Sequence, residues 1–238
     1  MSAPWDDPRV RRGLEKQLAW RRERLAAGEK SIGWKMAYGA PAIMQRLGIS
    51  APLAGFLTDR ARLESGATVS LRGWIKPVAE PELAVYLGKD LPAGTDRDAA
   101  VASIAAVRPA IELVDIERPA EPETLELTLA GNISQRHVVL GPLDGKLAGA
   151  DLANLKARVF RSDTEIAKTP DVTANTGDPV ELLRHLANLL AAFGERLRAS
   201  EFVITGSVVP PIFLEQPYEA IRFDLDPVGS VSVRFSVS

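Results

Sequence analysis

The segment PVAEPELAVYL, residues 77–87, places the tightest constraint on how this chain folds. Residue types alternate along it as in a β-strand, whose successive side chains point to opposite faces of a sheet. One face carries two carboxylates, Glu80 and Glu82, and the other is apolar, with Ala79, Leu83, Val85 and Leu87. The carboxylates are ~6.5 Å apart along the backbone, close enough to reach one cation. The alternative is a half-buried strand whose polar face contacts water.

Composition limits what such a pair can do. The chain has 238 residues, 46% of them hydrophobic, which is enough for one large domain or two small ones with a substantial core. A net charge of -2 gives no general attraction to nucleic acid or to an anionic membrane. Cysteine is absent, so disulfides and thiolate metal sites are excluded. With only two histidines, a metal must be held mainly by oxygen, which favours Mg²⁺ or Mn²⁺ over zinc.

Targeting and membrane signals are not found in the sequence. Residues 1–30 lack the apolar core of a signal peptide, and no apolar run approaches the ~20 residues that span a bilayer. We therefore expect a cytoplasmic protein. The arginines of 6–28 alternate with glutamates, which indicates a solvated helix face rather than a nucleic-acid surface.

Helical and strand-like segments are mixed along the chain. Hydrophobic periodicity and capping residues predict helices over 6–28, 40–49, 96–107, 121–130 and 178–199. Strands are predicted over 32–39, 66–87 with breaks at Gly73 and Pro77, 107–116, a hairpin at 156–169 that turns at Ser162–Asp163, and a pair around 227–229. Because no regular βαβ rhythm emerges, the pattern favours an α+β fold.

A third carboxylate, Glu112, lies in the apolar strand RPAIELVDIE. A buried carboxylate is costly without a cation or several hydrogen bonds. If this strand lies near 77–87, three carboxylates converge, which is a usual way to hold a catalytic Mg²⁺. The alternative for Glu112 is an ion pair with Arg108 or Arg118.

Lys35 is the other charged candidate, in a short apolar strand beside Trp34 and Met36. Such a lysine can act as an acid/base or as a counter-charge to a substrate. The alternative is a surface lysine whose stem lies along apolar residues. His185 sits among helix leucines and is expected to be a satisfied core or boundary residue. His137, soon after Asn132 and Ser134, is a weaker catalytic candidate.

Several segments carry a resemblance to a known family. They are GWKMAYGAPAIMQRLGISAPLAGFL, PVAEPELAVYLGKDL, AIELVDIE, GNIS followed by VVLG, and LLRHLANLLAAFGERLRASEFVITGS. In order and spacing they resemble the 2-keto-4-pentenoate hydratase and 4-oxalocrotonate decarboxylase family of the fumarylacetoacetase superfamily. The likeness runs from Gly33 to the C-terminus, and EPEL followed by AIELVD is its most specific part.

The resemblance implies a fumarylacetoacetase-like mixed β-roll with flanking helices, in which residues 1–65 form an N-terminal α/β segment and residues 66–238 the catalytic core. It implies a Mg²⁺ or Mn²⁺ site at Glu80, Glu82 and Glu112, and it implies that Lys35, Asn132 and Ser134 are catalytic. Family substrates are short 2-oxo or 2-hydroxydienoic acids. Relatives of this kind are usually homo-oligomers.

The chain departs from the family pattern near these positions. Gly131 stands where the family usually has Asp, and Ala37 and Gly39-Ala40 stand where it has Gly and Thr-Ser. A carboxylate and hydroxyls that hold substrate oxygens are therefore missing. These departures imply an unusual substrate or a lost activity.

The leading expectation is a metal-dependent lyase that hydrates a 2-hydroxypenta-2,4-dienoate through a metal-stabilised enolate. Decarboxylation of a 4-oxalocrotonate-type substrate uses the same ion and enolate and is not separated from it. A second class is a non-catalytic subunit that supports a partner lyase. Hydrolysis of a carbon–carbon bond is a third, which normally needs a histidine base, and His137 is the residue available.

Overall fold

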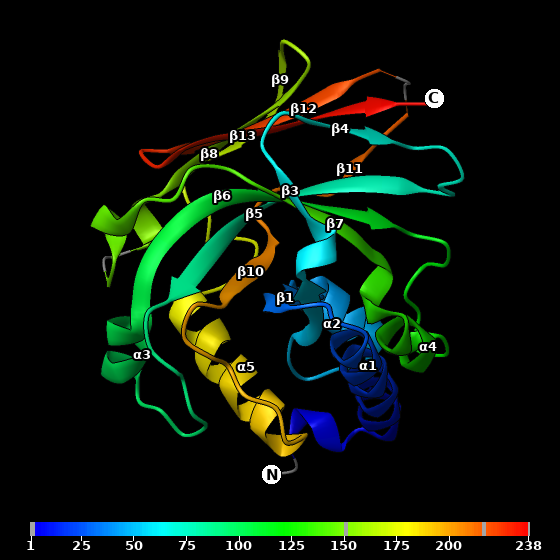
Figure 1. The fold of residues 1–238 in the computed structure, drawn as a ribbon, viewed down its shortest axis with the longest axis vertical. Helices are drawn as coiled ribbons and strands as arrows, with labels where there is room; N and C mark the ends of the chain where they lie inside the picture. The colour runs from blue at the N-terminus through cyan, green and yellow to red at the C-terminus, as the bar shows by residue number, and fades with distance from the viewer. Residues whose placement is uncertain (1–2, 150–151, 216–217, 238) are drawn as a thin grey trace.

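Two curled, mixed β-sheets and five α-helices make up most of the fold in a computed structural model, which describes residues 3–149, 152–215 and 218–237 (Figure 1). The larger sheet contains β1 (Ser31–Ala37), β2 (Leu53–Thr58), β3 (Arg62–Glu64), β5 (Pro77–Leu87), β6 (Ile104–Asp115), β7 (Gln135–Leu140), β10 (Phe202–Ser207) and β11 (Ile212–Phe213). Its strand order is β2-β1-β10-β5-β6-β7-β3, with β11 paired to β5.

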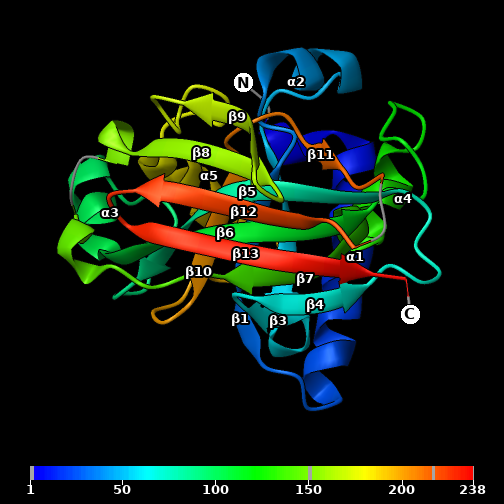
Figure 2. The same ribbon diagram turned by 90° about the horizontal axis from the view of Figure 1, so that it is seen from above.

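The smaller sheet contains β4 (Ala67–Ser70), β8 (Lys156–Arg161), β9 (Thr164–Thr169), β12 (Ala220–Asp226) and β13 (Gly229–Ser236), in the order β4-β13-β12-β8-β9. One face of β12 and β13 is fully buried, with Ile221, Phe223, Leu225, Val231, Val233 and Phe235. These two strands lie over β5 and β6 when the molecule is seen from above (Figure 2). The alternation expected for this strand pair is confirmed, and its apolar side forms the core between the sheets.

Five α-helices of the described residues flank the larger sheet: α1 (Pro8–Ala26), α2 (Pro41–Leu47), α3 (Arg97–Ser103), α4 (Leu125–Ala130) and α5 (Pro179–Ala192) (Figure 1). The helices α1 and α5 begin as their sequences predict, because Asp7 and Asp178 accept hydrogen bonds from the backbone N–H groups of Arg9 and Val180. The apolar residues of α5 are buried, among them Leu183 and Leu186.

Two predicted helices are too long. The helix predicted over 178–199 ends at Ala192, because Gly194 takes a left-handed φ of 75° and Glu195 N–H donates to the Leu190 carbonyl. This is the Schellman arrangement that terminates helices. The helix predicted over 96–107 ends at Ser103, where β6 begins, since Ile104 pairs with Leu87 of β5. The strand predicted over 107–116 is accordingly longer.

Most other predicted elements are confirmed, including the first strand, the hairpin turn at Ser162–Asp163 and the short helix near 40–49. The helix predicted over 121–130 is present but begins only at Leu125. The strands β2, β3, β7, β10 and β11 are not predicted by the sequence pattern. The strands β1 and β2, which precede residue 66, belong to the same sheet as β5 and β10. The predicted division of the chain into an N-terminal segment (1–65) and a catalytic core (66–238) stays a prediction. Among the described residues, no helix is long and apolar enough to cross a membrane.

Candidate metal centre

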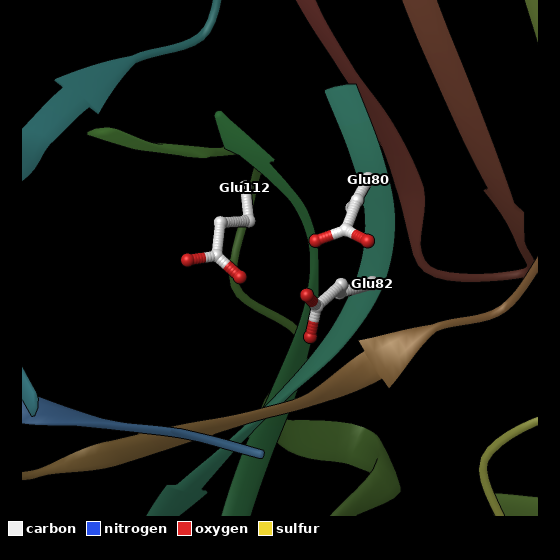
Figure 3. Close-up of side chains that lie close together, drawn as sticks. All are labelled: Glu80, Glu82 and Glu112. Carbon is white, nitrogen blue, oxygen red and sulfur yellow. The ribbon is translucent and has the colours of Figure 1, made fainter. Parts of the chain in front are cut away.

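The neighbouring strands β5 and β6 bring the three glutamates together. In the antiparallel register Glu80 pairs with Glu112, and Glu82 follows two residues along β5 on the same face. One carboxylate oxygen from each of Glu80, Glu82 and Glu112 lies within 4.8 Å of the other two. The carboxylates point toward one another from the two strands (Figure 3). The convergence that the alternation suggested is therefore present in the fold.

Burial sets the protonation of this cluster. Glu82 and Glu112 are each 1% exposed, whereas Glu80 is partly exposed. Burial raises the pKa of Glu80 to about 7, the negative charge of Glu112 adds to the rise, and Lys35 opposes it. Burial and the charges of Glu112 and Glu80 raise the pKa of Glu82 well above its usual range. Ionising the whole cluster therefore requires a compensating cation.

Backbone geometry fixes Glu82. Its Oε2 accepts a hydrogen bond of 2.6 Å from the N–H of Gly206. Gly206 has a left-handed φ of 98°, and the pairing of β10 with β5 shifts register between Ile204 and Ser207. This bulge turns a backbone donor toward a side chain instead of toward the neighbouring strand. One Glu82 oxygen is thus fixed by the backbone, and the Glu82 carboxylate also forms a hydrogen bond with the carboxyl group of Glu112.

Lys35 reaches the cluster from β1. Its Nζ lies 2.5 Å from Glu112 Oε1 and donates to the Ile133 carbonyl at 3.2 Å, and the residue is 1% exposed. The alternative of a surface lysine is therefore wrong. The partner of Glu112 is Lys35 and not Arg108 or Arg118. Burial raises the pKa of Glu112, and Lys35 acts in the opposite direction.

The segment after α4 carries Asn132 and Ser134, the other residues that the resemblance implies are catalytic. Asn132 is buried, and both polar atoms of its side chain bind the backbone of Phe56. Ser134 is partly exposed, and no hydrogen bond of its hydroxyl occurs within the described part of the chain. Gly131 ends α4 with φ of -84°, a conformation open to any residue.

Tyr38 is a site residue that the sequence reasoning missed. It follows β1 with a left-handed φ of 59°. Burial, then the charges of Glu80 and Glu112, raise the pKa of its phenol, so this side chain lies near the carboxylate cluster. Because Tyr38 follows Lys35 by three residues, its proximity to a candidate site residue could have suggested it.

The two histidines lie outside the cluster. His137 stacks against Trp74, with ring centroids 6.2 Å apart. His185 forms a 2.8 Å hydrogen bond with the Pro52 carbonyl, as a satisfied boundary residue does. Burial lowers the pKa of both residues. Neither residue contributes to the candidate ligand set, which consists of carboxylates.

The cluster fits a divalent cation. Three carboxylates and the Lys35 ammonium carry a net charge of -2 when ionised (-3 + 1), which one divalent cation balances. All candidate ligand atoms are oxygen, which suits Mg²⁺ or Mn²⁺. With one oxygen from each of the three carboxylates, an octahedral ion keeps further positions for water or substrate oxygens. Metal binding at these residues stays a prediction at this point.

Fold and site together define a class of protein. Residues 40–235 match the family described as fumarylacetoacetate (FAA) hydrolase C-terminal, so the chain belongs to this family. The predicted mixed β-roll is confirmed by the fold of its solved relatives.

Individual relatives are more specific. The chain is 34% identical to the 2-hydroxyhexa-2,4-dienoate hydratase of Comamonas testosteroni over 90% of this chain and 82% of that protein. It is 30% identical to the 4-oxalocrotonate decarboxylase of Pseudomonas putida over 90% and 81% of the two chains. The structure of 4-oxalocrotonate decarboxylase from Pseudomonas putida G7 with magnesium and adipate matches with a TM-score of 0.84 and 28% identity, over 92% and 83% of the chains. The predicted resemblance is confirmed.

Proposed function

We propose that this protein is a divalent-metal-dependent lyase acting on a short 2-oxo or 2-hydroxydienoic acid. Hydration of a 2-hydroxypenta-2,4-dienoate-type substrate is the leading reaction. The observation that carries the proposal is the buried convergence of Glu80, Glu82 and Glu112 beside Lys35. The names of the hydratase and decarboxylase relatives support it.

Glu80, Glu82 and Glu112 are the residues that hold Mg²⁺ or Mn²⁺ in this proposal. When bound, such an ion supplies Lewis-acid polarisation of the substrate's carboxylate and 2-oxo oxygens and offsets the charge of an enolate. Glu112 keeps one oxygen on Lys35, and Glu82 keeps one oxygen on the Gly206 N–H. Both side chains are therefore held in place while their other oxygens face the cluster.

Lys35 is the proposed proton-carrying or charge-balancing group. An ammonium has three N–H donors, and within the described residues two of them are directed to Glu112 and the Ile133 carbonyl. The third is assigned to a substrate oxygen. Burial of Lys35 excludes water, which strengthens an interaction between this ammonium and a developing negative charge.

Ser134 and Tyr38 are the proposed substrate contacts. Ser134 stands at the serine position of the family pattern and offers its hydroxyl to a substrate oxygen. Tyr38 adds a phenol near Glu80 and Glu112. A phenol is a neutral donor at pH 7, so it suits an oxygen of the substrate.

Decarboxylation of a 4-oxalocrotonate-type acid is the second candidate, and the match to 4-oxalocrotonate decarboxylase favours it. Both reactions need the same carboxylate cluster and Lys35. A related prediction is a family-like subunit without activity of its own, motivated by Gly131 and Ala40.

Ultraviolet absorbance tests the proposal. Freshly generated 2-hydroxypenta-2,4-dienoate is followed with purified protein and Mg²⁺, in parallel with EDTA and with Glu82→Gln. Dienol loss that needs both the metal and Glu82 supports a lyase, and product identification separates hydration from ketonisation. The same assay with 2-oxohex-3-enedioate and detection of CO₂ measures decarboxylation. No change with either substrate would favour the non-catalytic subunit.

A cytoplasmic homo-oligomer is the proposed working state, based on the family resemblance. Size-exclusion chromatography with light scattering measures the number of copies. Co-purification of a related lyase, together with no activity of this chain alone, would support the partner hypothesis. An active oligomer of this chain alone would exclude it.

A further inference from the structure

The turn between α4 and β7 has an uncommon backbone. Asn132, Ile133 and Ser134 have φ values of 54°, 53° and 59°, so three consecutive residues with side chains are left-handed. This conformation brings Cβ close to the following carbonyl oxygen and is disfavoured for L-residues other than glycine, with asparagine the least affected. Surrounding contacts must hold it in place, and strain of this kind gathers at functional sites.

Asn132 supplies those contacts. Its Oδ1 accepts from the Phe56 N–H at 2.9 Å, and its Nδ2 donates to the Phe56 carbonyl at 3.0 Å. β2, which carries Phe56, is the first strand in the sheet order, so no strand of the described residues pairs with its outer edge. The Asn132 amide pairs with this edge as a strand residue would. Both hydrogen-bonding atoms of a side chain that is 2% exposed are thus occupied.

The turn positions a backbone carbonyl that accepts a hydrogen bond from Lys35. The Ile133 carbonyl, one residue beyond Asn132, accepts from Lys35 Nζ at 3.2 Å, on an ammonium that also lies 2.5 Å from Glu112. Asn132 and Lys35 pass close to the same glycine: a Cβ on Gly55 would lie 2.7 Å from Asn132 Oδ1 and 3.0 Å from Lys35 Cγ. The two side chains share one confined space.

We infer that Asn132 is a positioning residue for Lys35: by fastening the left-handed turn to β2, it sets the Ile133 carbonyl that holds the ammonium against Glu112. The inference deepens the proposed function, on which it rests, because it assigns Asn132 no contact with the substrate. With two N–H groups directed to fixed acceptors, the direction of the third N–H of Lys35 is fixed as well. We call the two hydrogen bonds between Asn132 and Phe56 the clamp; without them the Ile133 carbonyl is no longer held and the ammonium can rotate.

Asn132→Gly is the informative variant. Glycine tolerates the left-handed backbone, so Asn132→Gly removes the side chain and its two hydrogen bonds to Phe56 without adding backbone strain. Ser162→Gly is the matched control, since Ser162 has a φ of 53° in the remote hairpin turn between β8 and β9. If Asn132→Gly loses cooperative unfolding, Asn132→Asp, which keeps the acceptor for the Phe56 N–H, serves in the same measurements.

Steady-state kinetics with 2-hydroxypenta-2,4-dienoate and saturating Mg²⁺ form the first test. We expect Asn132→Gly to lower kcat at least ten-fold with KM within two-fold of wild type, and Ser162→Gly to change neither. In the Lys35→Met background, Asn132→Gly should cause no further loss beyond two-fold, because the group it positions is gone. A raised KM at unchanged kcat, or a further ten-fold loss in that background, would show a direct substrate contact and overturn the inference.

A second test needs no turnover. In protein with ¹⁵N-labelled lysine, a buried and hydrogen-bonded ammonium exchanges slowly and gives an NMR signal, assigned to Lys35 by its loss in Lys35→Met. We expect this signal to shift or disappear in Asn132→Gly and to persist in Ser162→Gly. An unchanged signal in Asn132→Gly rejects the clamp. Because this readout is independent of substrate, an inactive wild type would reject the proposed function and leave the positioning role testable.

Discussion

Glu80 on β5 lies directly opposite Glu112 on β6 in the antiparallel ladder. Like charges in this position destabilise a sheet, and here a third carboxylate, Glu82, is buried beside them. Lys35 balances one of the three charges. The β5–β6 pairing is therefore most favourable when two further positive charges, as protons or as a divalent cation, are present.

Metal affinity should depend on Glu82. We expect Glu82→Gln to weaken Mn²⁺ binding by at least about ten-fold. Loss of a residue that only hydrogen-bonds a metal ligand already lowers metal affinity by about that factor. Isothermal titration calorimetry at pH 7.5 measures the affinity. Glu64→Gln, an exposed glutamate of β3, is the control and should bind as wild type. Unchanged affinity in Glu82→Gln would remove the proposed ligand set.

The stability of the metal-free protein should fall as pH rises. The pKa of Glu80 is raised from its ordinary 4.5 to about 7 in the fold, so the folded state binds this proton more tightly than the unfolded chain does. The stabilisation is complete below pH 4.5 and is lost through pH 7, with a cost of up to about 3 kcal/mol. Urea unfolding in EDTA from pH 5 to 8 measures it.

Two controls accompany that pH series. Glu80→Gln should make the decline smaller, because one of the three buried carboxylates with a raised pKa is removed. Saturating Mg²⁺ should also reduce it, because a bound cation holds the carboxylates in their ionised form. A decline of the same size in Glu80→Gln would assign the effect to other groups.

Replacing Lys35 should damage both folding and turnover. Lys35→Met leaves Glu112 buried without its partner, which costs about 3–5 kcal/mol for a buried ion pair, and removes the proposed proton-carrying group. Urea unfolding and kcat measure the two effects. Adding Glu112→Gln should recover stability but not activity. Lys30→Met, at an exposed lysine, is the control; near-normal turnover in Lys35→Met would refute the role of Lys35.

Gly55 should tolerate no side chain. A Cβ there would meet Asn132 Oδ1 at 2.7 Å and Lys35 Cγ at 3.0 Å, so we expect Gly55→Ala to cost about 1–3 kcal/mol through overpacking and to lower kcat. Gly145→Ala is the control, because its nearest neighbour would be 3.8 Å away. Thermal unfolding and kinetics check both variants. A stable, fully active Gly55→Ala protein would contradict the confined packing around Lys35.

Sequence reasoning found the carboxylates because their signal is local. Period-two alternation places Glu80 and Glu82 on one face, and an acid within an apolar strand marks Glu112 as in need of a partner. The identity of that partner depends on which strands become neighbours. Lys35 reaches Glu112 because β1 pairs with β10 and β10 with β5, and β10 was not predicted.

The role of Asn132 could not be predicted for a similar reason. Its amide is occupied by the edge of β2, a strand whose sequence, LAGFLT, is interrupted by glycine and gives a weak pattern. Tyr38 was missed because its left-handed backbone departs from the alternation of β1. Residues whose direction is set by strained backbone escape pattern-based prediction.

The three glutamates all come from one pair of adjacent strands, whereas Lys35 and Gly206 come from strands that are distant in the sequence. During folding, the acidic cluster can therefore assemble before its lysine arrives. At that stage the β5–β6 pair carries its charge repulsion without the ammonium, and a divalent ion bound at the proposed site would offset that repulsion. Refolding from denaturant should accordingly be faster with Mg²⁺ than with EDTA.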